Sequence, residues 1–567
     1  MVIYQPDDTD TLRMGHVYRH PFGCRFGPYS DPPLLANERN MCALSATLRA
    51  KPHWWIKMQD PAIRAKWLEE AVGAPPPYGE IFLTRDEVLY VLKELEWYAS
   101  RRDESTGIES SVYYRIWQSD SLVDGALRAE LMKHVAVLED VPDEAKDWHP
   151  GSDGQVLDLV HPSLYCIVYG RTFVYDSYDP RGQHVPPDLP RYAYDPETYV
   201  EVDHGWTEYF LSRRFSWLPT DFAISTDGSA KALGYINNLN PYTHDGMYPV
   251  IEKLVARFVP LWERVLAETR VENQPPCRVQ TNEYEWVPKD SGGNNDGDAG
   301  NDQWWNHDND VLRLPPVLTE FTPDIEPDPV NLKGRTLQVI IKLANIHLTP
   351  EKPRYPGGAW HVEGMINESI ISTGLYYYDE ENITQSSLAF RMAVNEPSYI
   401  LQDDEDASQA IYGFGRHEPL NQVVGAVATT QGRCVAFPNY YQHQVQPFEL
   451  TDASKPGHRK ILALFLVDPS LSKPRPSTSS VPPQQPDVLR FVLRGVAADM
   501  PIDEHGLRPA LGRLPVELLD LVAEQGDAVM MRAEAEAVRL ELMDERRGMV
   551  MKNDEKMFAH EYNMCEH

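Results

Sequence analysis

Two histidines and a glutamate in the second half of the chain have the types and spacing of metal ligands. His361 and Glu363 stand in the segment Trp360-His-Val-Glu-Gly364, and residues two apart on a β-strand point to the same side. His443 ends the segment Phe437-Pro-Asn-Tyr-Tyr-Gln-His443 and could supply a third ligand from a neighbouring strand. Two imidazoles and one carboxylate on one face of an octahedral ion leave its other positions open, which suits non-haem Fe(II).

A nearby arginine has the chemistry to bind a cosubstrate. Arg459 lies in the segment Gly457-His-Arg-Lys460, directly before the apolar run Ile461–Val467. Its guanidinium could hold the distal carboxylate of a cosubstrate through a bidentate pair. Lys342 is an alternative anchor, because an ammonium in an apolar strand needs an anionic partner when it is buried.

Short strands are the elements that must position these residues. β-branched and aromatic runs are separated by clusters of Gly, Pro, Asn and Asp, which is typical of an antiparallel sandwich or barrel. The predicted strands are Leu337–Leu348, Ile370–Tyr378, Leu388–Val394, Val423–Ala428, Cys434–Phe437 and Ile461–Val467.

Helical and irregular segments flank the strands. Apolar residues at helical spacing predict a helix over Met247–Arg270, with a kink at Pro260. The prolines of 471–490 predict an extended linker. The segment 491–567 that follows is predicted to be a helical tail, which packs onto the body or onto a second subunit as a homodimer.

An acidic insertion interrupts the chain at 289–310. Its Gly, Asn and Asp residues are too polar to bury, so we expect a disordered-like surface excursion. Asp296, Asp298 and Asp302 indicate calcium only weakly, because the glycine and the terminal glutamate of an EF-hand loop are not in their places.

The composition excludes several classes of partner. The 567 residues include 85 Asp and Glu against 53 Lys and Arg, which gives a formal net charge of -32. This balance argues against binding to nucleic acid and to a membrane surface. The six cysteines lack the CxxC or CxxxC spacing of a structural zinc site. We therefore expect a cytoplasmic protein that takes a small molecule, with a weak preference for a neutral or cationic one.

The order of the motifs resembles a known class of enzyme. RYPGGAWHVEG, TGLYYYDEEN, GRCVAFPNYYQHQVQPF and GHRKILALFLVDP follow one another as in the Fe(II)- and 2-oxoglutarate-dependent oxygenases of the double-stranded β-helix fold, over roughly Val330 to Pro469. The whole chain is similar to a large fungal family with a domain of unknown function. The residues Tyr235–Pro241, the WHVEG segment and Val481–Gln485 carry that second likeness.

The resemblance implies a fold and a domain organisation. We expect an α+β protein with a jelly-roll core, supporting helices and a C-terminal helical appendage. The oxygenase domain would cover 205–470 and include the insertion, after an N-terminal mixed α/β region over 1–204 whose role the sequence does not reveal.

The resemblance also implies roles for single residues. His361, Glu363 and His443 would bind Fe(II), and Arg459 would bind the distal carboxylate of 2-oxoglutarate. Asn345 and Tyr377 would also contact the cosubstrate. Turnover would oxidise an unidentified small molecule, by hydroxylation in the default case, while 2-oxoglutarate is converted to succinate. Two departures are the Glu in place of the commoner Asp, and the long gap between His443 and Arg459.

Two other functions stay open at this point. A cupin-type metal dioxygenase would work without 2-oxoglutarate but would need a third nitrogen ligand near Glu363. A non-catalytic binding protein on the same scaffold would use the helical tail as its interaction surface. Gly-x-Gly-x-x-Gly, Walker A and Gly-x-Ser-x-Gly sequences do not occur, which disfavours nucleotide cofactors and serine hydrolase chemistry.

Overall fold

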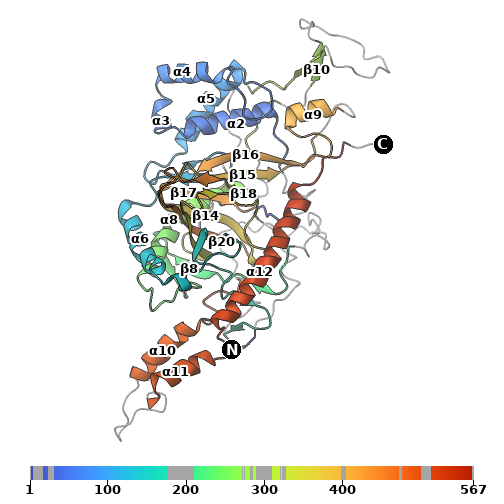
Figure 1. Cartoon of the computed structure of the whole chain (residues 1–567). Helices are drawn as coiled ribbons and strands as arrows, with labels where there is room; N and C mark the ends of the chain where they lie inside the picture. The colour runs from blue at the N-terminus through green and yellow to red at the C-terminus, as the bar shows by residue number, and fades with distance from the viewer. Residues whose placement is uncertain are drawn as a thin grey trace.

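The computed structural model of the chain (Figure 1) describes most of its residues. The insertion expected at 289–310, including Asp296, Asp298 and Asp302, lies outside the described residues except for Asp310. The described residues are 2–3, 17–22, 31–175, 210–270, 273, 275–280, 285–288, 310–318, 321, 327–397, 404–471, 475–499 and 513–564.

A large antiparallel sheet forms the centre of the protein. Its middle strands are neighbours in the order β17 (Cys434–Pro438), β14 (Ile370–Glu381), β20 (Gly457–Val467) and β12 (Thr336–Leu348). Shorter strands extend both edges, so segments from the first half of the chain are part of this sheet. They are β2 (Glu109–Ser110) and β3 (Trp117–Ser119) beside β17, and β4 (Val156–Val160), β8 (Thr220–Ile224) and β9 (Ala230–Ala232) on the side of β12.

A second, smaller sheet packs against one face of the large sheet, which is called its inner face below. Its strands are β16 (Asn421–Ala428), β15 (Ser387–Ala393) and β18 (Gln442–Val445), again antiparallel. One apolar core contains buried side chains of both sheets, and the rings of Phe390 and Phe437 meet across it at 4.9 Å. The six strands that were predicted from β-branched and aromatic runs are confirmed, and they belong to two antiparallel sheets within a mixed α/β protein.

One long helix covers the other face of the large sheet. The predicted helix is confirmed as α8 (Met247–Thr269), which contains Pro260, and its apolar side packs on β14 and β17. The helix lies very close to β14 at Gly374, where an added Cβ atom would be 2.5 Å from a ring carbon of Phe258. A glycine at this position therefore sets the distance between helix and sheet. Helix α6 (Gly125–Glu139) packs beside α8.

The N-terminal helices form a unit with its own core, drawn in blue in Figure 1. Thr84 and Glu87 make a reciprocal capping box at the start of its longest helix. The helices are α2 (Ala36–Arg49), α3 (Trp54–Lys57), α4 (Pro61–Ala71) and α5 (Arg85–Ser100).

The predicted tail contains helices, but the first of them begins at Pro486, inside the segment 471–490 that was expected to be an extended linker. Helices α10 (Pro486–Asp499) and α11 (Val516–Glu524) pair with each other, and α12 (Arg532–Asn553) runs along the front of the body in Figure 1. Leu542 of α12 is fully buried in the core between the two sheets. This helix is therefore part of the body. None of the described helices is both long and apolar enough to cross a membrane.

Short elements complete the described part of the chain. They are the strand pairs β1 (Val2–Ile3) with β6 (Phe173–Val174), β5 (Ile167–Val168) with β7 (Phe215–Ser216), β10 (Glu285–Pro288) with β11 (Asp310–Arg313) and β13 (Arg354–Tyr355) with β19 (Phe448–Glu449), and the helix α9 (Glu405–Tyr412).

We predict that Gly374→Ala destabilises the protein by about 1–3 kcal/mol, because the added methyl group must push α8 away from β14. Denaturant unfolding followed by circular dichroism measures the change. Gly548→Ala in α12 is the matched control: no atom lies within 4 Å of the added Cβ, so the free energy of unfolding should stay the same or rise. Equal stability of wild type and Gly374→Ala would show that the helix does not pack this tightly.

Candidate metal centre

The structure brings His361, Glu363 and His443 together. The Glu363 Oε1 atom lies 3.6 Å from His361 Nε2 and 3.4 Å from His443 Nε2, and the two imidazole rings are 4.3 Å apart. All three potential ligand atoms lie within 4.8 Å of one another. The His443 side chain is 5% exposed and that of His361 is 32% exposed, so one side of the cluster is open. These three groups can hold one divalent cation and leave positions for other ligands.

Backbone pairing positions the two histidines. The amide of His361 donates to the carbonyl of His443 at 3.1 Å, and the amide of His443 donates back to His361 at 3.0 Å. His443 is itself held on β18, opposite Phe390 of β15. The segment that carries His361 and Glu363 thus lies beside β18 at the edge of the smaller sheet.

A further hydrogen bond fixes the imidazole of His361 in a ligand tautomer. Its Nδ1 atom lies 2.9 Å from the carbonyl oxygen of Ala359. A carbonyl only accepts, so Nδ1 carries a proton, and Nε2 is the nitrogen left to bind a metal when the ring is neutral.

The charges within the cluster favour a bound cation. Burial alone would raise the pKa of Glu363, but hydrogen bonds from His361 and His443 outweigh it and hold the pKa well below its usual value. Burial, together with the charge of His361, lowers the pKa of His443. For His361 the same burial is outweighed by Glu363, so its pKa is raised. Metal binding requires the Glu363 anion and two neutral rings, so a cation bound here would displace the proton that Glu363 favours on His361.

Asn439 holds the backbone of Glu363 in place. Its Oδ1 atom accepts from the amide of Glu363 at 2.7 Å, and its Nδ2 atom donates to the carbonyl of Glu363 at 2.8 Å and to that of Ile370 at 3.0 Å. The Asn439 side chain is fully buried, and its amide group makes the hydrogen bonds to the Glu363 backbone that a neighbouring strand would otherwise make. Asn439 therefore links the segment of the first two candidate ligands to the end of β17, just before His443.

Arg459 is a buried cation that forms no ion pair with a described acid; Glu380, its register partner on β14, interacts with it only through longer-range electrostatics. Its side chain is 2% exposed, Nη1 donates to Thr429 Oγ1 at 3.3 Å, and Nε has no hydrogen-bond partner. The guanidinium lies over the rings of Tyr377 and Phe448, at 5.4 and 5.0 Å. Burial lowers its pKa. An unpaired charge in such a place is costly, and a bound anion would remove that cost.

The two other residues predicted to contact a cosubstrate lie on different faces. Tyr377 lies beside Arg459, and its buried hydroxyl has no hydrogen-bond partner. The side chain of Asn345 is on the opposite face of β12, where Nδ2 donates to Glu139 at 2.5 Å and Oδ1 accepts from the hydroxyl of Tyr378. The structure therefore brings Tyr377 to Arg459 and does not bring Asn345 there.

A second cluster of potential ligands, His149, Asp158 and His161, lies at strand β4. Its carboxylate already has partners, because Asp158 Oδ2 accepts from Arg539 and lies 2.7 Å from His149 Nδ1. Burial lowers the pKa of His161 well below its usual value, so the ring is neutral. Its Nδ1 accepts from the amide of Ser163, so the ring proton is on Nε2. The Oδ2 atom of Asp158 is thus engaged, and Arg539 joins the cluster to helix α12, while Oδ1 has no hydrogen-bond partner among the described residues.

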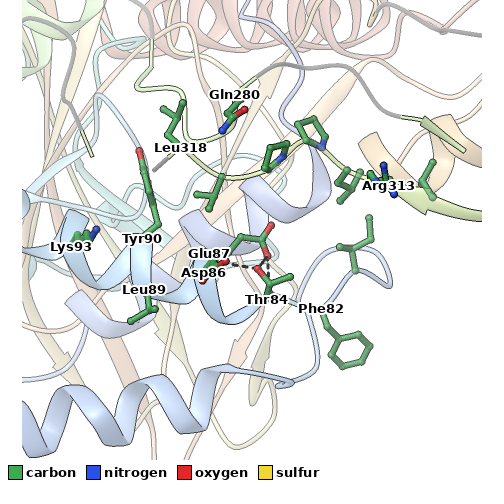
Figure 2. A pocket seen from close by; sticks show the side chains of 16 residues that line it. Phe82, Thr84, Asp86, Glu87, Leu89, Tyr90, Lys93, Gln280, Arg313 and Leu318 are labelled. Atoms are coloured by element: carbon green, nitrogen blue, oxygen red, sulfur yellow. Dashed lines mark hydrogen bonds between the residues drawn. The ribbon is translucent and has the colours of Figure 1, made fainter. Parts of the chain in front are cut away.

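A large open pocket of the N-terminal region contains no residue of either cluster. The pocket has a volume of about 800 Å³ and lies between α5 and the segment 312–318, as Figure 2 shows. Among its polar side chains are Thr84 and Glu87, which cap α5, together with Lys93. We therefore assign no chemistry to it.

Contacts with helix α12 support the segment that carries His361 and Glu363. Glu368 Oε2 accepts from the amide of Met365 at 2.6 Å, and its Oε1 accepts from the guanidinium of Arg546, which lies over the ring of Trp217 at 3.7 Å. An apolar cluster joins the metal-binding segment to the tail. It consists of Phe22, Phe210, Val362, Met365, Met549, Met557 and Phe558.

The tail also contacts β18 and β15. Gln442, next to His443, donates to Asn553 at 3.1 Å, while Arg391 is bound by Gln442 and Asp554 and lies over the ring of Trp360. Sequence spacing does not reveal Asn439, Glu368 or Arg546 as supporting residues, because each acts through a contact between distant parts of the chain. The only local signal was that Asn439 belongs to the Phe-Pro-Asn motif.

Comparison with protein families identifies the family. The model of the family described as "Protein of unknown function (DUF4246)" matches residues 85–490, and that of "Domain of unknown function DUF4246, N-terminal" matches residues 2–70. These matches cover more than half of the chain, so the protein belongs to the DUF4246 family. No curated protein matches it. Helix α12 lies beyond the matched residues.

Solved structures with some likeness include several oxygenases. One is the Fe(II)/α-ketoglutarate-dependent dioxygenase TqaL, at 12% identity and a TM-score of 0.20, covering 44% of this chain and 66% of that one. Another is the dioxygenase for auxin oxidation of rice, at 13% identity and a TM-score of 0.23, covering 64% and 77%.

A further solved structure with some likeness is a bsmA homolog from Methylobium petroleophilum PM1, at 11% identity and a TM-score of 0.15, covering 24% of this chain and 43% of that one. The chain thus spans less than two thirds of the length of TqaL and of the bsmA homolog. With scores this low, these likenesses carry no argument about the protein, and the function has to be argued from its own residues.

We predict that Asn439→Ala weakens the binding of a divalent metal by roughly 10- to 100-fold, because Glu363 loses the side chain that fixes its backbone. Competition with a metal-binding dye, using Co(II) as the probe, measures the affinity. Asn421→Ala, which removes an amide bound to Phe558 of the tail, is the control and should bind Co(II) as wild type does. An unchanged affinity in Asn439→Ala would contradict the positioning role.

Proposed function

We propose that the protein is a non-haem Fe(II)- and 2-oxoglutarate-dependent oxygenase. The observation that carries the proposal is a pairing of two features. An open cluster of two histidines and one carboxylate lies in the same space between sheets as a buried, unpaired arginine. The first feature suits ferrous iron, and the second suits the far carboxylate of a dicarboxylic oxo acid.

The path of the chain supports a jelly-roll core for this enzyme. In chain order, the strands alternate between the two sheets. Strand β12 belongs to the large sheet, the segment of His361 lies beside the small one, β14 belongs to the large one, and β15 and β16 belong to the small one. The path continues with β17 in the large sheet, β18 in the small one and β20 in the large one. Two Greek-key turns of this kind make a double-stranded β-helix. We place this oxygenase domain at 205–470, with the edge strands of 1–204 as its extension.

Each protein group then has one task. His361 and His443 bind the metal through Nε2, and Glu363 binds it through its carboxylate. Arg459 and the hydroxyl of Tyr377 bind the distal carboxylate of 2-oxoglutarate. When bound, the iron and the oxo acid together supply oxygen activation and the oxidation of a substrate C–H bond. The surrounding core residues, among them Phe437 with its ring 4.9 Å from that of His443, exclude water from the reacting atoms.

The substrate in this proposal is a small organic molecule, and hydroxylation is its default fate. A homodimer would use the exposed apolar residues of α11, because α12 is occupied by the body. Those residues include Val516, Leu518, Leu521 and Val522.

We predict that the protein with Fe(II) and 2-oxoglutarate develops a visible charge-transfer absorption band under anaerobic conditions. His361→Ala and His443→Ala should each abolish the band, because two remaining ligands hold iron too weakly. His149→Ala, from the second cluster, is the matched control and should keep the band. A band that depends on His149 but not on His361 would transfer the metal to the other cluster and contradict the proposal.

For Arg459→Met we predict normal iron binding and an affinity for 2-oxoglutarate that is lower by roughly 100-fold, since a charge-assisted pair is lost. Anaerobic titration of the absorption band measures the affinity. The affinity for 2-oxopentanoate, which lacks the distal carboxylate, should not change. Without ligand the variant should also be more stable than wild type, because an unpaired buried charge has been removed. Equal loss of affinity for both acids would refute a role at the distal end.

A further inference from the structure

Lys342 lies on the inner face of the large sheet, where a cation is unusual. On β12 it alternates with the core residues Ile340 and Ile346, whereas the residues between them face helix α8. The register pairs Lys342 with Ala463 of β20 and pairs Ile346 with Arg459. Lys342 and Arg459 therefore face the same space between the sheets, about 13 Å apart along the strands.

The ammonium group of Lys342 has no direct partner in the described part of the chain. It is half-buried and makes neither a hydrogen bond nor an ion pair with any described residue. The nearest acid on this side, Asp158, already binds Arg539 and His149. Lys342 thus has a positive charge without an ion pair in a largely apolar strand, and such a charge favours an anionic ligand.

Lys342 is also close to the candidate metal ligands. The sheet register agrees with this placement. Lys342 is paired with Ala463, and the next paired residues on the same face are Ile340 and Phe465 in one direction and Ala344 and Ile461 in the other. The first of these pairs is in register, through β14, with Phe437, whose ring contacts His443. The second is in register with Tyr377. Lys342 thus belongs to the space between the metal ligands and Arg459.

Small side chains adjoin Lys342 on this face. Ala344 of β12 is the next residue on the same face, and Ala463 of β20 is its register partner. Ile461 and Tyr377 lie between this level and that of Arg459.

We propose that Lys342 is a second carboxylate-binding group of this space, separate from Arg459. This inference rests on the proposed oxygenase function and extends it. The carboxylate has two sources: the metal-side carboxylate of the 2-oxo acid, or an acidic group of the organic substrate. In the second case the substrate is an organic acid, although the overall charge of the chain alone would favour a neutral or cationic molecule.

The first arm of the test uses Lys342→Met, which keeps the length of the side chain and removes the charge, and Lys342→Arg, which restores a charge. Lys352→Met removes an exposed lysine just beyond β12 and is the control. The full-length protein with Fe(II) is titrated anaerobically with 2-oxoglutarate and with 2-oxopentanoate, and the absorption band is followed. If the oxo acid is the source, Lys342→Met binds both acids about tenfold more weakly, because their metal-side carboxylates are identical. Lys342→Arg recovers the affinity.

The second arm keeps 2-oxoglutarate saturating and adds pairs of probes, each a free acid and its neutral amide, such as phenylacetate with phenylacetamide and amino acids with their amides. If the organic substrate is the source, acids shift the band of the wild type and amides do not, while Lys342→Met loses the shift. Lys342→Met that behaves as wild type in both arms overturns the inference.

Failure of the proposed oxygenase function would give a different result from failure of the Lys342 inference. A wild type that develops no band with 2-oxoglutarate argues against the oxygenase. Calorimetric titration of 2-oxoglutarate and the probe acids into the same protein then tests Lys342, and equal heats for wild type and Lys342→Met overturn its role. Thermal melting of each variant shows that it is folded.

Discussion

The two backbone hydrogen bonds between His361 and His443 are the contact on which the candidate site depends. They join the segment after β12 to strand β18, which comes much later in the sequence, and they bring the three potential ligand atoms within 4.8 Å of one another. Asn439 adds side-chain hydrogen bonds to the backbone of Glu363, and Glu368 with Arg546 holds the following turn. The cluster is therefore fixed by long-range contacts from three directions.

Charge is distributed unevenly between the surface and the interior. The chain carries a formal net charge of -32, yet the inner face of the large sheet presents two cations, Arg459 and Lys342, that form no ion pair with a described acid. A folded protein tolerates such groups at a cost in stability when a ligand supplies the missing charge. The acidity of the whole chain limits its partners, but the local cations decide what enters the space between the sheets.

Much of the architecture could be predicted from the sequence. The β-branched and aromatic runs between turn residues predicted β12, β14, β15, β16, β17 and β20, and the helical spacing predicted α8. The spacing of His361 and Glu363 placed both on one side, and the register then brought His443 to them. Arg459 was recognisable because it stands directly before an apolar strand.

Other features depend on pairing between distant segments, which spacing does not encode. Asn345 is an example: alternation puts it on the face opposite Lys342, and only the register with β20 and the position of α8 reveal which face is inside. The edge strands β3 and β4, and the support of the site by α12, likewise arise from contacts between residues that are far apart in the chain, such as Arg546 and Glu368. For the same reason Asn439 and Arg546 could not be identified before the fold was known.

Anomalous diffraction at the iron edge is the most direct test of the metal assignment. Crystals grown without oxygen, with Fe(II) and 2-oxoglutarate, should show one anomalous peak between His361 Nε2, Glu363 and His443 Nε2, with density for the cosubstrate extending toward Arg459. A peak at His149, Asp158 and His161, or no peak within the chain, would contradict the account.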